Sequence, residues 1–319
     1  TDIEAPTINL DLSGIIDGII TGRTDIKGTV TDTNLDYYTL EVARWGTDNW
    51  QEVFKGTTSI TNGTLGKFDP SLLENDSYRV RLTAYDTSGR GSQIEDQIDV
   101  TGDLKLGNFR LSFTDLTIPV TGIPISLTRT YDSLTSGTTD DFGYGWRMEF
   151  RDTDLRTSLK ADPYYEQLDY RTVGFNFGTR IYITLPGGKR EGFTFQPQQV
   201  QGALGGLTGG RLFYPSFVSD KGVTSTLTVP GAEIKANTNI YSANAGTSSG
   251  NPNGVLLYKE GKLFNLAGRP YVPQDDGFGN RYILTTKDGT QYEINATTGD
   301  LESVRDTNGN VLTYSDTEI

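Results

Sequence analysis

The sequence contains neither cysteine nor histidine among its 319 residues. Without cysteine there is no disulfide framework, no thiolate nucleophile and no thiolate metal site. Without histidine the chain lacks the side chain whose unperturbed pKa suits proton transfer near neutral pH, which excludes Ser-His and Cys-His mechanisms. The remaining catalytic routes need a carboxylate pair, an activated Lys, a Tyr or Ser-Lys arrangement, or a metal held by oxygen ligands, and none has a recognisable spacing. We therefore expect no catalysis and no cofactor.

Basic residues are fewer than acidic ones: the chain has 28 Lys and Arg against 41 Asp and Glu, which gives a formal net charge of −13. The phosphate attraction that drives nucleic-acid binding is missing, so we expect no nucleic-acid partner. Long apolar runs are also absent, which predicts no membrane insertion. The only methionine is Met148, and the chain starts in a polar stretch typical of an interdomain linker. We expect a piece of a longer polypeptide.

The residues that are abundant favour strands and turns: 38 Gly, 17 Tyr and 14 Phe, with many Thr, Ile and Val. The length suits two domains, and the pattern predicts an all-β fold with little helix. In the first hundred residues, short segments with alternating apolar positions are separated by polar turns. Tyr38, Leu40 and Val42 share one face of such a segment. About seven segments of this kind predict a β-sandwich over residues 1–102.

Short sequence motifs in this first region resemble those of bacterial Ig-like or fibronectin-like modules of surface proteins. The resemblance rests on Gly28-Thr29-Val30-Thr31-Asp32, Tyr38-Thr39-Leu40 and Tyr85-Asp86-Thr87-Ser88-Gly89. It implies an Ig-like β-sandwich that serves as a spacer or docking module.

A second pattern begins at about residue 103, where alternation from Ile123 to Tyr131 predicts one long, half-buried strand. Several motifs follow one another in order. They are Gly107-Asn108-Phe109, Leu111-Ser112-Phe113, Gly122-Ile123-Pro124, Leu127-Thr128-Arg129-Thr130-Tyr131 and Phe142-Gly143-Tyr144-Gly145-Trp146. This series resembles the N-terminal segment of Rhs/YD-repeat proteins. Between about 196 and 254, stretches rich in Gly, Asn and Ser predict an irregular insertion.

Glycines recur every ten residues near the end of the chain, at Gly279, Gly289, Gly299 and Gly309. Ten residues correspond to one strand plus one tight turn, and Asp288-Gly289 and Asn308-Gly309 are strong hairpin signals because Gly admits positive φ. We therefore predict a meander. The sequence from Asp288 to Tyr314 resembles the first full YD repeat. Residues 103–319 are therefore expected to run from the Rhs N-terminal segment into that repeat.

Three motifs could suggest chemistry, and each has a simpler interpretation. Gly246-Thr247-Ser248-Ser249-Gly250 matches a nucleophile elbow, but no histidine can act as base. Asp32, Asn34 and Asp36 alternate as in a calcium loop, although Tyr37 stands where the turn needs Gly, so a turn capped by Asp is preferred over calcium binding. Paired carboxylates are expected by chance on so acidic a chain. They are Asp140-Asp141, Asp275-Asp276 and Asp152 with Asp154.

Aromatic residues supply the other candidates. Phe142-Gly143-Tyr144-Gly145-Trp146 could stack on a sugar, but we expect it to be a buried core anchor whose glycines let the backbone approach closely. Arg129 and Tyr131, in the long strand that ends at Tyr131, are expected to be structural residues as well. Tyr37, Tyr164 and Tyr165 are the candidates for glycan contact, because strand alternation leaves one ring of each Tyr pair on the surface.

The Rhs/YD resemblance implies that the chain is a non-catalytic scaffold, the start or cap of a β-sheet shell that encapsulates a C-terminal toxin or effector. Its implied partners are downstream YD repeats and that effector, within a bacterial protein that is secreted or displayed on the cell surface. The alternative is an adhesion module that binds cell-surface carbohydrate or protein. Glycan binding or a calcium-dependent shift in melting temperature would separate the two.

Overall fold

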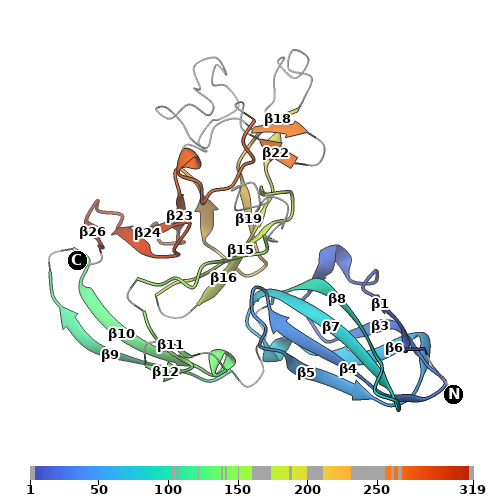
Figure 1. Ribbon diagram of the computed structural model, residues 1–319. Helices are drawn as coiled ribbons and strands as arrows, with labels where there is room; N and C mark the ends of the chain where they lie inside the picture. Colours follow the sequence, from blue (N-terminus) through green and yellow to red (C-terminus); the bar gives the residue numbers. More distant parts are fainter. Residues whose placement is uncertain are drawn as a thin grey trace. The chain divides into compact units, whose positions relative to one another are not determined.

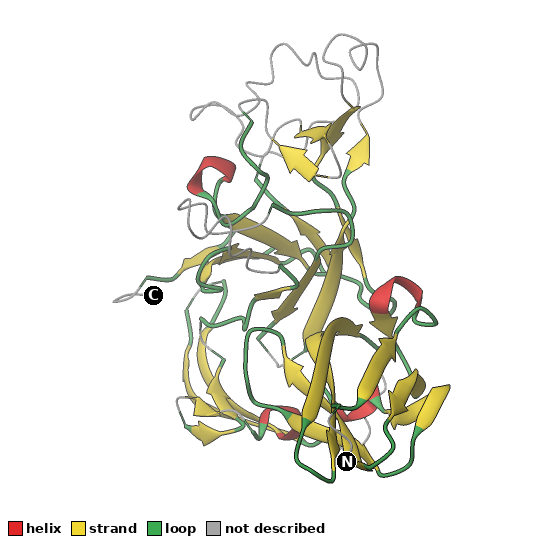
Figure 2. Ribbon diagram, turned by 45° about the vertical axis from the view of Figure 1, so that its right-hand side comes forward, coloured by secondary structure: helices red, strands yellow, loops and turns green. Residues whose placement is uncertain are grey.

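The structure is a computed structural model of the chain. It describes residues 4–102, 105, 108–120, 122–137, 139–140, 142–149, 151–159, 174–186, 189–199, 211–230, 256–259, 262–264 and 268–315. Strands and loops make up nearly all of this part (Figure 2). The helices in it are single 3-10 turns, at Ile16–Gly18 (η1), Pro70–Leu72 (η2), Ser133–Thr135 (η3) and Asp276–Phe278 (η5). The all-β class predicted from composition is confirmed.

The chain divides into two compact units, Thr1–Phe109 and Arg110–Ile319. The sequence predicts a boundary at about residue 102. No helix within the described ranges is long and apolar enough to cross a membrane.

The first unit is a sandwich of two β-sheets (Figure 1). One sheet has the strand order β1-β3-β6 and the other has the order β2-β8-β7-β4-β5. The short strand β2 runs parallel to β8, and the other neighbours are antiparallel. The strands are β1 (Thr7–Asp11), β2 (Ile19–Ile20), β3 (Thr24–Thr31), β4 (Leu35–Arg44), β5 (Gln51–Gly56), β6 (Ile60–Phe68), β7 (Asp76–Asp86) and β8 (Gly91–Val100).

Apolar side chains at alternate positions of the long strands fill the space between these two sheets. Leu40 and Val42 of β4 lie opposite Leu82 and Val80 of β7, and all four side chains are at most 3% exposed. Burying each such side chain stabilises the fold by about 1.5–3 kcal/mol. The apolar positions predicted from the period of two are therefore the core of this unit.

The described residues of the second unit form five antiparallel sheets, with the orders β13-β10-β9, β11-β12, β14-β15-β16-β19, β17-β18-β21-β22 and β20-β23-β24-β25-β26. The first strands are β9 (Arg110–Ile118), β10 (Ile125–Asp132), β11 (Thr139–Asp140), β12 (Gly143–Tyr144), β13 (Trp146–Met148), β14 (Arg156–Thr157), β15 (Arg180–Thr184) and β16 (Arg190–Phe195). The later strands are β17 (Gln198–Gln199), β18 (Arg211–Tyr214), β19 (Phe217–Ser219), β20 (Thr226–Thr228), β21 (Leu256–Lys259), β22 (Lys262–Phe264), β23 (Arg281–Thr285), β24 (Gln291–Asn295), β25 (Leu301–Arg305) and β26 (Val311–Thr313).

One apolar cluster joins the sheet that contains β15 and β16 to the sheet that ends at β26. Ile181 and Phe193 come from the first sheet, Tyr282 and Ile294 come from the second, and each is 0% exposed. Tyr271 lies among them, with its ring stacked on Phe195 at a centroid distance of 5.5 Å. The two sheets therefore share one core.

The last four strands form a meander in the order β23-β24-β25-β26. Gly279, Gly289, Gly299 and Gly309 each precede one of these strands, and their φ angles lie between 80° and 94°. Only glycine adopts this region without strain. The predicted correspondence between the ten-residue spacing and a strand plus a turn is confirmed for these positions.

The prediction of an irregular insertion over 196–254 is wrong for much of its described part. Residues 198–199, 211–214, 217–219 and 226–228 form β17 to β20. Leu227 of β20 is 2% exposed in the common core, opposite Leu284 of β23. Glycine-rich composition obscured strands of only two to four residues, whose pairing partners are distant in sequence.

Candidate functional site

Arg129 lies at the centre of an aromatic cluster on the three-stranded sheet β13-β10-β9. Its guanidinium carbon is 5.9 Å from the ring centre of Phe113, 5.6 Å from that of Phe142 and 5.9 Å from that of Trp146. Its Nε and Nη2 donate to the two carboxylate oxygens of Asp115 at 2.6 and 2.9 Å. This bidentate pair fixes the guanidinium over the rings, an arrangement in which cation–π attraction is favourable.

The predicted burial of Phe142-Gly143-Tyr144-Gly145-Trp146 is wrong for its rings. Phe142 is 43% exposed, Tyr144 is 68% exposed and Trp146 is half-buried. Phe142 lies in the turn before β12, Tyr144 lies on β12 of the two-stranded sheet, and Trp146 lies on β13 beside Phe113, which is itself 47% exposed. In the part of the chain that the structure describes, neither of these two sheets therefore buries the three rings in a closed core.

Gly145 within this segment lies in close contact with the neighbouring strand. Its φ is 73°, and a Cβ there would lie 2.8 Å from the ring of Tyr131 and 3.0 Å from the carbonyl oxygen of Asp132. Tyr131 in turn packs against Trp146 at a centroid distance of 5.5 Å. Gly143 also has positive φ, but nothing lies within 4 Å of a Cβ built on it. The turn needs both glycines, and the packing needs Gly145.

Gly289 and Gly309 lie in hairpin turns of the same construction. In each turn the glycine N–H donates to a carbonyl oxygen three residues earlier, from Gly289 to Thr286 at 2.9 Å and from Gly309 to Asp306 at 3.2 Å. The carboxylate of Asp306 also accepts the backbone N–H of Asn310 at 2.8 Å. These residues reverse the chain.

Of the candidate glycan contacts, Tyr37 is described, whereas Tyr164 and Tyr165 lie outside the described residues. Tyr37 is half-buried on the outer side of the five-stranded sheet of the first unit. Its ring lies 5.4 Å from that of Tyr85, and the Lys55 Nζ stands 4.1 Å from its centre. The pair presents an aromatic surface that already has a cation over it.

The proposed alternative to calcium binding agrees with the local hydrogen bonds. The carboxylate of Asp32 accepts the N–H of Asn34 at 2.6 Å, as in a turn capped by Asp. Asp86 does the same for the N–H groups of Ser88 and Arg90, both at 2.8 Å. Within the described residues, no three acidic side chains gather in a way that could hold a metal ion.

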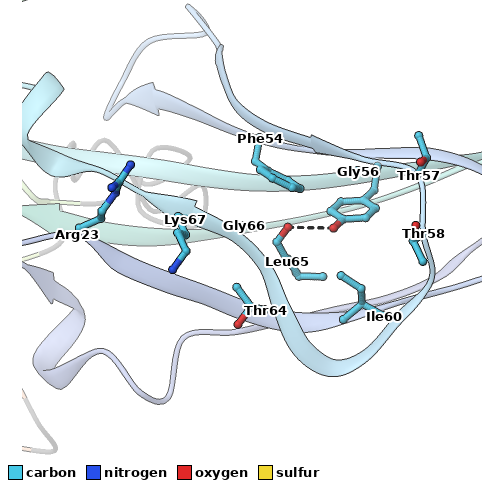
Figure 3. A pocket seen from close by; sticks show the side chains of 11 residues that line it. Arg23, Phe54, Gly56, Thr57, Thr58, Ile60, Thr64, Leu65, Gly66 and Lys67 are labelled. Atoms are coloured by element: carbon cyan, nitrogen blue, oxygen red, sulfur yellow. Dashed lines mark hydrogen bonds between the residues drawn. The ribbon is translucent and has the colours of Figure 1, made fainter.

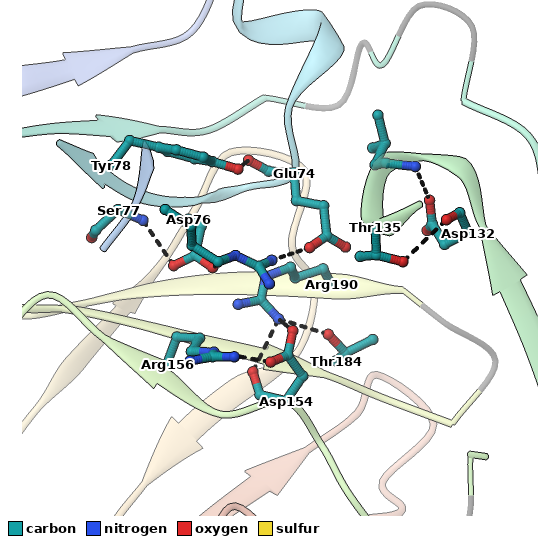
Figure 4. A network of polar contacts seen from close by, with 12 residues as sticks. Glu74, Asp76, Ser77, Tyr78, Asp132, Thr135, Asp154, Arg156, Thr184 and Arg190 are labelled. Atoms are coloured by element: carbon teal, nitrogen blue, oxygen red, sulfur yellow. Dashed lines mark hydrogen bonds and ion pairs between the residues drawn. The ribbon is translucent and has the colours of Figure 1, made fainter. Parts of the chain in front are cut away.

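Two of the carboxylates considered for glycoside hydrolysis, Asp154 (Figure 4) and Asp275, hold ion pairs or cap a turn. Asp154 accepts from Arg190 at 2.8 Å and from Arg156 at 3.0 Å. Asp275 caps η5 through the N–H of Gly277 at 2.7 Å and pairs with Arg269. Asp141 lies outside the described residues.

Two polar features could not be found from sequence. In the first unit Arg44 pairs with Glu74 and, at 2.8 Å, with Asp76. Figure 4 labels the two acidic residues. In the second unit Arg180 is 2% exposed and donates to Asp220 at 2.7 Å. The partners in each pair are about thirty or forty residues apart, and no motif links them.

A groove of about 580 Å³ opens between β5 and β6 of the first unit (Figure 3). Tyr38 and Phe54 form its walls, and the Tyr38 hydroxyl donates to the carbonyl oxygen of Leu65 at 2.9 Å. Burial raises the pKa of Tyr38. A Cβ on Gly56 would lie 2.4 Å from the Tyr38 ring, and one on Gly66 would lie 2.7 Å from the Phe54 ring. Gly56 and Gly66 are the sequence positions that could have pointed to the groove. Their close packing against the two rings explains a glycine at each position without any ligand.

Comparison with protein families matches residues 103–175 to the model of a domain of unknown function, DUF6531. The match begins just before β9 and includes the aromatic cluster. Comparisons with curated proteins and with solved structures give no match.

Proposed function

We propose that this chain is a non-catalytic scaffold that starts or caps a β-sheet shell of the Rhs/YD-repeat type, and that the shell encloses a C-terminal toxin or effector. The meander at the end of the second unit is the observation that carries the proposal. Its strands repeat every ten residues and place Tyr282, Ile294, Leu301 and Val304 on one buried face. A sheet built this way can be lengthened one hairpin at a time, as in repeat architectures.

The family match supports the same proposal. The DUF6531 range, 103–175, covers the motifs that resemble the Rhs N-terminal segment, and this domain is commonly associated with Rhs/YD-repeat proteins. The first unit would be an Ig-like spacer or docking module ahead of the shell, and the natural setting would be a bacterial secreted or surface protein. Downstream repeats would then pair with β26, which ends its sheet in the described part of the chain.

The proposal is tested by adding a second copy of residues 279–315 after Ser315. If the repeats template one another, the added copy should fold on β26, and the extended chain should melt in one transition at a higher temperature. A control extension of the same composition in scrambled order should not raise the melting temperature. Equal melting temperatures for both extensions would contradict the scaffold function.

The absence of catalysis is tested separately, with the purified chain and panels of glycoside, peptide, ester and nucleic-acid substrates. We expect no turnover, because the chain has no histidine or cysteine and the candidate carboxylates Asp154 and Asp275 are engaged in ion pairs and a turn. Reproducible turnover that is abolished by a single substitution such as Asp154→Asn would overturn this part of the proposal.

The exposed rings of Phe142 and Tyr144 favour a second candidate, an adhesion module that binds carbohydrate. Exposed rings can stack on sugars, and the Arg129 guanidinium beside Phe142 can donate hydrogen bonds to sugar hydroxyls. A glycan array probed with the chain and with the Phe142→Ala/Tyr144→Ala variant tests this. A signal lost in the variant at an unchanged melting temperature would favour binding over scaffolding for this surface.

A further inference from the structure

Strand β9, Arg110–Ile118, is exposed along all nine of its residues and, among the described residues, is an edge strand of its sheet. Four of its side chains are large and apolar: Leu111 is 38% exposed, Phe113 47%, Leu116 47% and Ile118 43%. Monomeric proteins seldom leave so long an apolar edge strand open, because its unpaired backbone groups are a template for another strand.

The two faces of β9 have different chemistry. On one face, hydroxyls meet across the pair with β10: Ser112 with Thr130 at 2.7 Å and Thr117 with Ser126 at 3.5 Å. The register shift between Leu127 and Thr128 gives β9 one extra residue. Leu116 therefore returns to the face that holds Phe113, and all four apolar side chains share that face.

Charges that usually protect an edge strand are few in β9. Strand β5, the edge of the other unit's larger sheet, carries Glu52 and Lys55. Between Leu111 and Ile118 the only charged residue is Asp115, and its carboxylate is held in place by Arg129 of the neighbouring strand. The edge therefore lacks the free charge that would repel a second strand.

We propose that β9 pairs antiparallel with β9 of a second copy of this chain. The sequence of β9 is complementary to itself about a two-fold axis between Thr114 and Asp115. In that register Leu111 lies opposite Ile118 of the second copy, and Phe113 lies opposite its Leu116. Directly opposite residues lie on the same face of the sheet, so apolar side chains meet only apolar ones.

The polar positions fit the same register. Ser112 lies opposite Thr117 of the second copy, which extends the hydroxyl face, and Asp115 lies opposite Thr114. Arg110 lies opposite Pro119, so no residue lies directly opposite a like charge. The two Asp115 carboxylates lie one position apart, and each is paired with Arg129 of its own chain. An isologous dimer of this kind is closed, and it removes both open edges at once.

The surface area that two paired β9 strands would bury limits the affinity of this dimer. Edge pairing of nine-residue strands covers less than the roughly 800 Å² per partner of a standard stable complex. We therefore expect a reversible dimer with a Kd on the order of micromolar or weaker.

The first test is sedimentation equilibrium of the full chain over a concentration series, with Leu116→Lys as the variant. Two lysines per interface, each opposite Phe113 of the other copy, should raise the Kd at least about tenfold. Val311→Lys is the matched control, because Val311 is 46% exposed on β26, the edge strand of another sheet. A chain that is monomeric throughout, or a dimer lost with Val311→Lys and kept with Leu116→Lys, would overturn the proposal.

The second test fixes the register and does not depend on a disruptive substitution. Because the chain has no cysteine, introduced thiols are unique. A mixture of Ser112→Cys and Thr117→Cys chains should form a disulfide-linked dimer, since opposite Cα atoms lie roughly 4.5–5.5 Å apart. Ser112→Cys alone should not, because its two copies would lie five positions apart, roughly 17 Å. Equal crosslinking of the mixture and the single variant would refute the register.

Discussion

Trp146 lies against Phe113, with ring centroids 6.2 Å apart and planes inclined by 23°, although β10 runs between their two strands. Both rings are also near the guanidinium of Arg129. The contact joins β13 to the far strand of the sheet while leaving the rings partly in solvent.

Because Trp146 is only half-buried, Trp146→Ala should destabilise the chain less than a core truncation does. We expect a loss of about 1–2 kcal/mol in the free energy of unfolding, against about 3–5 kcal/mol for Phe195→Ala, whose ring is 0% exposed. Urea unfolding followed by circular dichroism measures both. Equal losses for the two variants would mean that Trp146 is a core residue after all.

The glycine turns of the meander should resist substitution. At Gly309, φ is 86° and nothing lies within 4 Å of an added Cβ, so Gly309→Ala should cost about 1–2 kcal/mol from backbone strain alone. Gly289→Ala should cost at least as much, since its Cβ would also lie 2.7 Å from a methyl carbon of Thr307. Gly14→Ala is the control, because Gly14 has neither positive φ nor a near neighbour. Thermal unfolding that ranks Gly14→Ala with the other two would be inconsistent with the turn assignment.

Carboxylates in the turns should make the fold sensitive to acid. The side-chain amide of Asn310 lowers the pKa of Asp306, and the hydroxyls of Thr286 and Thr290 lower the pKa of Asp288. A carboxylate with a lower pKa in the folded state stabilises the fold above its unfolded pKa, about 3.9, and this contribution is lost as the pH falls through the folded pKa.

We therefore expect the free energy of unfolding to fall below about pH 4, and to fall less steeply in Asp288→Asn/Asp306→Asn. Urea titrations at a series of pH values measure both slopes. Parallel curves for the variant and the parent chain would show that these turns do not contribute.

The buried ion pair of Arg180 and Asp220 should be costly to break. Asp220→Ala leaves a guanidinium that is 2% exposed without its carboxylate, and we expect a loss of about 3–5 kcal/mol. Lys67→Ala removes the exposed pair with Asp25 and should cost at most about 1 kcal/mol. The double variant Arg180→Met/Asp220→Leu should recover much of the loss. Similar denaturation midpoints for Asp220→Ala and Lys67→Ala would contradict the burial of this pair.

Local patterns of the sequence predicted those features that depend on near neighbours. The alternation around Leu40 and the glycine spacing around Gly289 each specify a strand face or a turn within ten residues. The exposure of the Phe142 ring could not be predicted this way. Alternation assigns a side chain to one face of a strand, but it does not say whether a second layer covers that face. The pair of Arg180 and Asp220 and the walls of the β5–β6 groove likewise depend on strands that meet only in three dimensions.

The central claim is that the meander ending at β26 is an extendable scaffold, and amide exchange at Val311–Thr313 tests it most directly. Hydrogen–deuterium exchange would be followed by mass spectrometry in the chain alone and in the chain extended after Ser315 by a second copy of residues 279–315. The scaffold account predicts that the β26 amides exchange markedly more slowly in the extended chain, because a new strand pairs with them, while β23 amides are unchanged. Equal exchange of β26 in the two proteins would contradict it.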